Sequence, residues 1–237
     1  MSKKTSFYMV ALSLAMMLCV GLTSCNKDDD NDNNNSSTPP ASTGKAPENA
    51  VAVDLGLPSG TKWANMNVGA TTPEGYGGYF AWGETEDKAT YSWGTYQYSK
   101  DGTKNDLVHI GVEIVGTKYD AAYMKWGGNW RMPTKEQIME LLEKCSKEWA
   151  TLNGIGGVLL KGPNGKTIFL PAAGEKKESL SGQGTSGDYW SGSNKTTEFE
   201  DSYQLSFHHY TSPEESITTS CTDGGRYRGK SIRAVMK

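Results

Sequence analysis

An uncharged run of apolar and small residues spans positions 7–22, directly after two lysines, Lys3 and Lys4. This order, a positive start followed by an apolar stretch, is typical of an export signal. The run is shorter than the roughly 20 residues that a membrane-spanning helix needs, and a polar stretch follows it closely. We therefore predict that residues 1–24 form a signal peptide, which is removed.

The clearest helical pattern follows Met132 and Pro133. Thr134 is placed to cap the helix, and Gln137, three residues later, completes a capping box. Apolar residues then recur at helical spacing on one face; they are Ile138, Leu141, Leu142, Cys145 and Trp149. The pattern predicts one main helix at about 134–147.

Short apolar stretches separated by turn residues predict the strands. Residues 158–161 and 166–170 flank Gly-Pro-Asn-Gly, which predicts a hairpin because Pro and Asn favour the turn and Gly accepts a positive φ. Further strands are expected at 51–55 and 61–68, which form an entrance hairpin, and at 188–191, 202–210 and 230–235. One good helix among several short strands indicates an α+β fold.

Residues 84–128 show no clear period, although aromatic residues are frequent in them. Long segments of this kind in a compact domain are usually functional loops or elements that a pattern search misses. We expect long irregular loops in this part of the chain.

The apolar run ends in Leu-Thr-Ser-Cys at positions 22–25, which resembles the lipobox of bacterial lipoproteins. Cys25 is therefore predicted to carry a lipid anchor, with diacylglyceryl on its sulfur and acyl chains such as palmitate. The alternative is an ordinary secretory peptide in which this cysteine is incidental.

Residues 25–49 are rich in Asp, Asn, Ser and Pro. They bury too little apolar surface to offset the entropy of ordering, so we predict a disordered tether. Its Lys27 and acidic residues resemble the signal that sends Bacteroidetes lipoproteins to the outer face of the outer membrane. We expect a lipid-anchored protein facing the cell exterior; a periplasmic orientation is the alternative.

Charge and cysteine content narrow the class of protein. Removal of Lys3 and Lys4 with the signal changes the formal net charge from −3 to −5. The remaining Lys and Arg form no basic stripe, so nucleic acid is not an expected partner. Cys145 and Cys221 are the two cysteines left to pair, and a disulfide and a buried free thiol at Cys145 are both open. Residues 50–237 have the length of one domain.

Several segments together resemble the family named for the Fibrobacter succinogenes major paralogous domain. They are Val-Asp-Leu-Gly-Leu-Pro-Ser-Gly-Thr-Lys-Trp-Ala at 53–64, Asn-Val-Gly-Ala at 67–70, Tyr-Phe-Ala-Trp-Gly-Glu at 79–84, Trp-Arg-Met-Pro-Thr at 130–134, Ile-Phe-Leu-Pro-Ala-Ala-Gly at 168–174, Gly-Asp-Tyr-Trp-Ser at 187–191 and Ser-Ile-Arg-Ala-Val at 231–235. Each segment alone is weak, but together they run in order across nearly the whole domain.

That family is similar in fold to C-type lectin domains and to formylglycine-generating sulfatase-modifying factors. The resemblance implies a C-type-lectin-like α+β domain of short, twisted antiparallel strands. It also implies termini that meet in one sheet and irregular loops on one side. It implies no established activity.

No combination of residues predicts catalysis, a cofactor or a metal site. Cys221 is expected in a loop, and Cys145 on the helix leaves it without the partner cysteine of a formylglycine-generating site. His208 and His209 are adjacent on a predicted strand, where side chains point to opposite faces, so they do not easily share an ion. Glu84 and its acidic neighbours are expected in a solvated loop, although such a carboxylate is also one half of a glycosidase pair.

Exposed aromatic and arginine side chains remain as candidates for binding. Four tryptophans in the family-like segments are expected in the core; they are Trp63, Trp82, Trp130 and Trp190. Tyr and Arg are frequent at binding hot spots, so the late segment supplies the candidate ligand-binding residues; they are Tyr203, His208, Tyr210, Arg226, Tyr227 and Arg228. The predicted function is non-catalytic binding of a glycan or a surface protein. The alternatives are an enzyme of the formylglycine-generating or glycan-hydrolase type, and a structural envelope component.

Overall fold

The computed structural model describes residues 42 and 44–237, all within one compact unit. The predicted signal peptide, Cys25 and residues 25–41 and 43 of the predicted tether lie outside the described residues. Residues 44–49, the predicted end of the tether, contact the first helix, since Ala46 N–H donates to Trp126 O at 3.0 Å. No helix in the described part of the chain is long and apolar enough to span a membrane.

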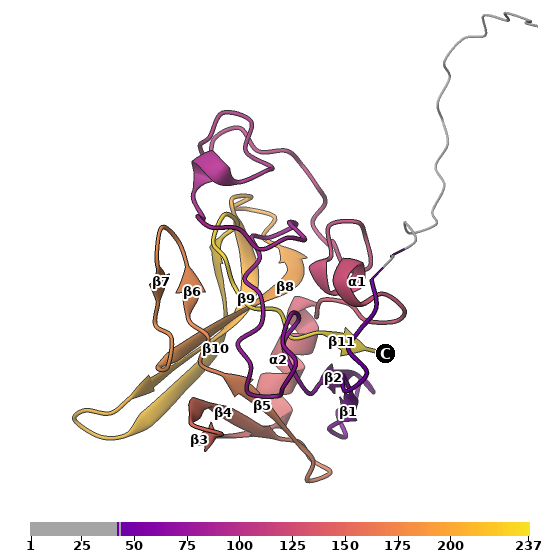
Figure 1. Ribbon diagram of the computed structural model, residues 1–237, viewed down its shortest axis with the longest axis vertical. Coiled ribbons are helices and arrows are strands. Elements are labelled where there is room, and N and C mark those ends of the chain that lie inside the picture. The colour runs from indigo at the N-terminus through magenta and orange to yellow at the C-terminus, as the bar shows by residue number, and fades with distance from the viewer. Residues whose placement is uncertain (1–41, 43) are drawn as a thin grey trace, which may run out of the picture. The chain divides into compact units, whose positions relative to one another are not determined.

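The described residues contain two α-helices, a short 3₁₀ helix and eleven strands (Figure 1). The helices are α1 (Ala121–Trp126) and α2 (Lys135–Lys144), with η1 at Trp93–Thr95. The strands are β1 (Ala52–Asp54), β2 (Lys62–Ala64), β3 (Ser146–Leu152), β4 (Ile155–Lys161), β5 (Thr167–Pro171), β6 (Glu175–Lys176), β7 (Leu180–Ser181), β8 (Ser186–Asn194), β9 (Asp201–Tyr210), β10 (Ser216–Gly225) and β11 (Val235–Met236). Antiparallel sheets with few helices confirm the α+β class.

The strands form four antiparallel sheets. Their orders are β1-β2-β11, β10-β9-β8, β3-β4-β5 and β6-β7. The predicted hairpin around residues 162–165 is confirmed, because β4 pairs with β5 and Gly165 takes a φ of +82° in the turn. The two ends of the domain meet in one sheet as expected, since β2 pairs with both β1 and β11.

Two predicted strands are shorter than expected. The entrance hairpin is confirmed, but β2 ends at Ala64 instead of continuing to Val68. In the last segment, β11 contains residues 235–236, whereas Lys230 and Ser231 make isolated bridges to Phe80 and to Tyr189. The chain changes backbone partners here, and this interrupts a continuous ladder.

The main helix, α2, begins as predicted. Thr134 caps it, with Gln137 N–H donating to Thr134 Oγ1 and Thr134 N–H donating to Gln137 Oε1 at 2.9 Å. The predicted end near residue 147 is wrong, because Cys145 is extended and β3 starts at Ser146. Trp149 therefore lies on β3 and not on the helix face. These residues pair with β4, which satisfies their backbone hydrogen-bonding groups in place of a further helical turn.

The sequence pattern does not predict helix α1, because six residues are too few to show a period. Its signals are nevertheless present in the sequence: Asp120 caps its first turn and Gly127, with φ +63°, ends it. Asp120 also accepts hydrogen bonds from the backbone N–H of Gly116 and of Met132, at 2.8 and 3.0 Å. One buried carboxylate thus joins the helix to the loop before it and to the segment that leads into α2.

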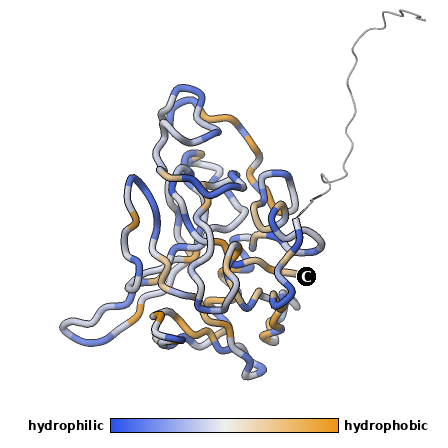
Figure 2. The backbone as a smooth tube through the Cα atoms, in the orientation of Figure 1, coloured by the Kyte–Doolittle hydropathy of each residue, from blue (hydrophilic) through white to orange (hydrophobic). Residues whose placement is uncertain are grey.

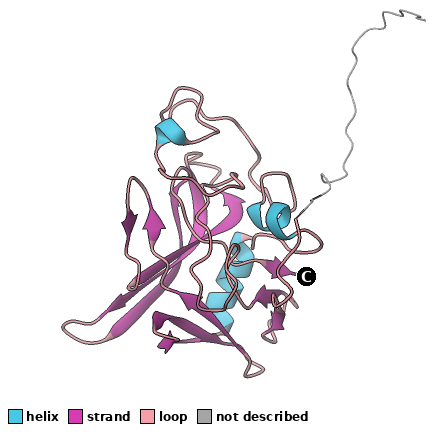
Figure 3. Cartoon of the chain, viewed as in Figure 1, coloured by secondary structure: helices cyan, strands magenta, loops and turns pink. Residues whose placement is uncertain are grey.

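The core contains all four tryptophans that were expected there. Trp63, Trp82, Trp130 and Trp190 are at most 5% exposed. Hydrophobic residues concentrate around β4 and β5, whereas the residues at the tip of the β9–β10 hairpin are hydrophilic (Figure 2). Between β2 and α2 the chain is mostly loop, with η1 and α1 as short exceptions (Figure 3).

Tyrosines hold the long loop in place. Tyr91 and Tyr96 are buried beside Tyr79 and Ala81, and the Tyr96 hydroxyl donates to Trp82 O at 2.7 Å. Large aromatic side chains bury enough surface to order a segment that lacks regular structure. The irregular segment is therefore a folded part of the domain.

Candidate functional site

The predicted ligand-binding residues on β9 lie apart from one another along the strand. Tyr203 is half-buried and faces Lys135, whose Nζ is 3.9 Å from the ring centroid. His208 and Tyr210 lie at the other end, with ring centroids 4.3 Å apart, and Tyr210 is 46% exposed. The structure does not combine these three side chains in one site.

Arg226 is fully buried, so its prediction as a surface contact residue is wrong. Its guanidinium lies 4.7 Å from the Trp82 ring centroid, and its Nε donates to the Tyr96 hydroxyl at 2.9 Å. A cation enclosed by aromatic faces is stabilised by their quadrupoles, and here that contact holds the long loop against the core. The arginine therefore has a structural role.

Tyr227 lines a pocket, whereas Arg228, the next residue, does not. The pocket has a volume of about 440 Å³ and lies between η1 and the β6–β7 hairpin, and we call it the aromatic pocket. Its lining combines aromatic, hydroxyl and charged side chains, from Tyr91, Ser92, Trp93, Lys177, Glu178, Ser179, Ser181 and Tyr227. This volume and this mixture are typical of a small-ligand site.

Backbone hydrogen bonds join the three segments that form the aromatic pocket. Tyr91 N–H donates to Lys177 O at 3.0 Å, which connects the long loop to the β6–β7 hairpin. Lys176 and Gly229 exchange two backbone hydrogen bonds, at 2.7 and 2.9 Å, which connect the hairpin to the turn after β10. Gly229 is needed for this approach, because a Cβ there would lie 2.7 Å from the Tyr91 ring. The pocket is therefore preformed.

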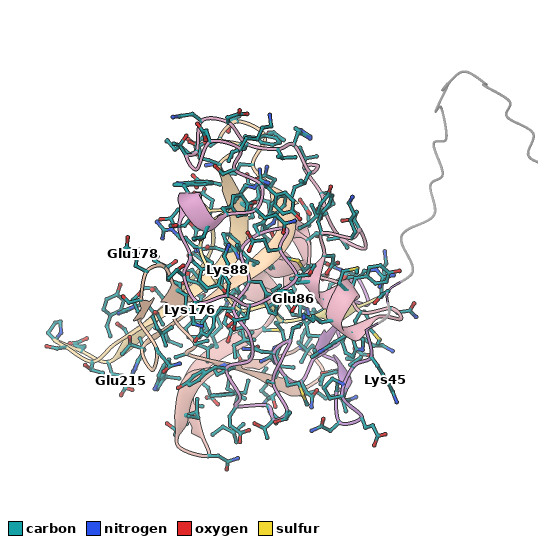
Figure 4. The ribbon with its side chains drawn as sticks, turned by 45° about the horizontal axis from the view of Figure 1, so that its top comes forward. Lys45, Glu86, Lys88, Lys176, Glu178 and Glu215 are labelled. Carbon is teal, nitrogen blue, oxygen red and sulfur yellow. The ribbon has the colours of Figure 1, made fainter. Side chains whose placement is uncertain are left out.

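The aromatic wall is made by Trp93 and Tyr227. Their ring centroids are 4.8 Å apart at an interplanar angle of 48°, and the Tyr96 ring meets Trp93 edge-on at 5.8 Å. Both wall residues are half-buried, so part of each ring faces the pocket. Glu178 lies on the β6–β7 hairpin, opposite this wall. Figure 4 shows Glu178 on the same side of the view as Glu215, at the tip of the β9–β10 hairpin.

Glu175 organises the charges behind the aromatic pocket. Lys177 Nζ is 3.0 Å and Arg228 NH1 is 3.1 Å from Glu175 Oε1. Burial alone would raise the pKa of Glu175, but Lys230, Lys177 and Arg228 together lower it below its usual value. The carboxylate stays charged and orients Arg228 and Lys177, of which Lys177 lines the pocket.

Both described cysteines are free, and Cys145 is buried. Cys221 lies on β10 and not in a loop as predicted, because residues 216–225 pair fully with β9. It lines a separate pocket with Tyr203 and Glu143, but burial raises the pKa of its thiol. A raised pKa leaves less of the nucleophilic thiolate at neutral pH.

The expected solvated acidic loop is partly buried. Glu84 is 7% exposed and pairs with Lys88 Nζ at 2.7 Å, and it accepts a hydrogen bond from Gln97 N–H at 2.8 Å. The expectation of full solvation is wrong for this residue, because Lys88 and the Gln97 amide compensate its burial. Its two oxygens thus support the long loop.

His208 and His209 have different partners, as expected for neighbours on a strand. His209 stacks on Trp149 with centroids 4.0 Å apart, while His208 packs on Tyr210. Within residues 42 and 44–237, one acidic group has oxygens close enough to share an ion; it contains Glu198, Asp201 and Asp223. The Lys195 ammonium pairs with two of these carboxylates, those of Glu198 and Asp223, and offsets part of the negative charge of the cluster.

Most of the aromatic pocket cannot be recognised in the sequence. Trp93 carries one signal, since it lies in the long aperiodic segment, where functional loops are common. Lys177, Glu178 and Ser181 carry none, because strands of two residues leave no pattern. Among the residues that line the pocket, the sequence predicts only Tyr227 as a candidate for binding.

No protein-family model, no curated protein and no solved structure matches this chain.

Proposed function

We propose that the chain is an outer-membrane surface lipoprotein whose C-type-lectin-like domain binds a glycan, without catalysis, in the aromatic pocket. The lipobox-like sequence at Cys25 supports the anchor, and the acidic residues after it support outward display. The ordered family-like segments and the shared sheet of the two ends support the lectin-like comparison. The observation that carries the binding function is the Trp93–Tyr227 wall facing a polar rim.

The chemistry of the aromatic pocket suits a sugar. A pyranose has an apolar C–H face that packs on an aromatic ring, while its hydroxyls need donors and acceptors at the edge. Trp93 and Tyr227 offer the ring faces, and Ser92, Lys177 and Glu178 offer polar groups around them. Such a combination of apolar area with a few placed polar groups gives orientation as well as affinity.

We expect Trp93→Ala and Tyr227→Ala to weaken glycan binding at least roughly tenfold, because each removes ring area at the centre of the site. The measurement is a glycan-array screen of the purified full chain, followed by titration of the strongest glycan. Tyr210→Ala is the matched control, since it removes an exposed tyrosine far along β9 and should leave affinity unchanged. An equal loss of affinity in Tyr210→Ala, or unchanged affinity in both pocket variants, would contradict the assignment of the aromatic pocket as the glycan site.

The anchor has its own test. Cys25→Ala is expected to abolish incorporation of a labelled fatty acid and to release the protein from the membrane fraction, because the acylated sulfur is removed. Protease treatment of intact cells then reports whether the wild-type domain faces outward. Continued labelling of Cys25→Ala would exclude this residue as the lipid site.

A further inference from the structure

Lys230 is a buried lysine on the segment before β11. It is 0% exposed, and its Nζ lies 4.4 Å from the centroid of the Trp190 ring. Burial lowers the pKa of Lys230 to about 8, against the opposing effect of Asp188 and Glu175. A lysine in such surroundings is much closer to its neutral, nucleophilic form than an exposed one.

The Lys230 amine directly contacts the side-chain amide of Gln204, on β9. Lys230 Nζ meets Gln204 Oε1, and Gln204 is 4% exposed. Gly224, on the neighbouring strand, leaves room for this contact: a Cβ there would lie 2.6 Å from Lys230 Nζ and 2.9 Å from Gln204 Oε1. The nucleophile and the carbonyl are thus held together out of water.

A carboxyl group completes the arrangement. Gln204 Nε2 donates to Asp188 Oδ1 at 2.9 Å, so Asp188 touches the nitrogen that would leave. Burial raises the pKa of Asp188, and Lys230 partly offsets this. Glu175 Oε2 lies 3.5 Å from Lys230 Nζ on another side. Glu175 is therefore placed to accept a proton from Nζ, and Asp188 is placed to give one to Nε2.

We propose that Lys230 and Gln204 become joined by an intramolecular isopeptide bond, with Glu175 as the base and Asp188 as the acid. The neutral amine attacks Gln204 Cδ and a Cδ–Nζ bond forms. Nζ loses a proton to the Glu175 carboxylate, and the Asp188 carboxyl gives a proton to Nε2. The Cδ–Nε2 bond then breaks, and one ammonia leaves for each amide formed. The exchange of one amide for another needs no oxidant or added reactant.

The bond would tie β9 to the C-terminal segment across 26 residues of chain. Glu175 connects this site to Arg228, since its carboxylate lies close to both Lys230 Nζ and Arg228 NH1. A covalent tie of this kind restricts the unfolded chain and keeps the two segments together. It is suited to a domain displayed outside the cell.

The test is peptide mapping of the purified full chain after denaturation and trypsin digestion. We expect a branched peptide in which residues 196–226 are joined to residues 229–233, lighter by one ammonia than the sum of its parts. Trypsin does not cleave after an acylated lysine, so no cleavage should occur at Lys230. Linear 196–226 together with cleavage after Lys230 in the wild-type protein would overturn the proposal.

Three variants identify the atoms that the bond joins and the group that protonates the leaving nitrogen. Lys230→Arg keeps the charge but should give only linear peptides. Gln204→Glu should lose the ammonia-deficient species, because its side chain has no ammonia to release. Asp188→Asn should lower the linked fraction at least roughly tenfold in folded protein, as loss of a general acid–base does. A branch from Lys230 to Asp188 or Glu175 with loss of water, or full linkage in Asp188→Asn, would contradict the assigned atoms.

Discussion

Asp120→Ala is expected to lower the free energy of unfolding by about 5 kcal/mol, because it leaves several buried backbone donors without acceptors. Asp120 is 0% exposed. Its oxygens accept from Gly116, Tyr123 and Met132 N–H at 2.8, 2.9 and 3.0 Å. Urea unfolding should show a lower midpoint with an unchanged slope.

The matched control for this change is Asp106→Ala. Asp106 is 53% exposed and pairs with Lys100, which is 58% exposed. Exposed pairs contribute at most about 1 kcal/mol, so this variant should resemble the wild type. Similar midpoints for the two variants would show that the Asp120 hydrogen bonds do not carry the stability assigned to them.

Asp120 also makes the stability of the protein depend on pH. Burial raises the pKa of Asp120 to about 6, although its backbone hydrogen bonds oppose this. The pKa of Asp120 in the unfolded chain is near 3.8, so the folded state favours the protonated carboxyl. The stabilisation is therefore fully present below about pH 4 and is lost as pH rises through 6, a change of up to about 3 kcal/mol.

Comparison with Asp120→Asn isolates this effect from other titrating groups. The difference in unfolding free energy between wild type and variant should fall between pH 4 and pH 7. Urea titrations at a series of pH values measure it. A difference that stays constant or grows with pH would contradict the raised pKa.

Arg233→Ala is expected to lower the free energy of unfolding by about 4 kcal/mol, because it leaves a cavity and three acceptors without their donor. The Arg233 side chain is 1% exposed. Its three nitrogens donate to Asn67 Oδ1 at 2.9 Å, to Ala64 O at 3.0 Å and to Phe169 O at 2.8 Å. One guanidinium thus joins three separate parts of the chain.

Arg233→Lys is the matched variant for this site. It keeps the charge, but an ammonium cannot replace the planar fork that reaches three acceptors, so we expect an intermediate loss of about 2 kcal/mol. Denaturant unfolding of the two variants and of the wild type measures both losses of unfolding free energy. Full stability in Arg233→Ala would exclude the three hydrogen bonds as a source of stability.

The elements predicted from sequence are those with strong local signals. Thr134 and Gln137 specify the start of α2 by contacts within one helical turn, and the residues around Asn164 specify a hairpin. The end of α2 lies earlier than the pattern predicts, because the residues after Cys145 pair with β4 instead of extending the helix. Helix α1 is not predicted because six residues give too short a pattern.

The candidate site could also be predicted only in part from the sequence. The chemistry of Tyr227 and Arg228 predicts a binding role; Tyr227 lines the aromatic pocket, whereas Arg228 pairs with Glu175. The same criterion selects Arg226, which is buried against Trp82 and Tyr96. Residue type alone does not distinguish these cases, because exposure depends on which segments pack against each side chain.

By itself the sequence determined the α+β class, the capped start of α2, the main hairpin and the tryptophan core. Each of these depends on the spacing of residues that are near in the chain or on the burial preference of large apolar side chains. Only the tertiary structure decided that Trp93, Lys177 and Tyr227 share a pocket and that Lys230 meets Gln204. These groups come from distant segments, and the backbone and side-chain contacts that align them leave no periodic mark in the sequence.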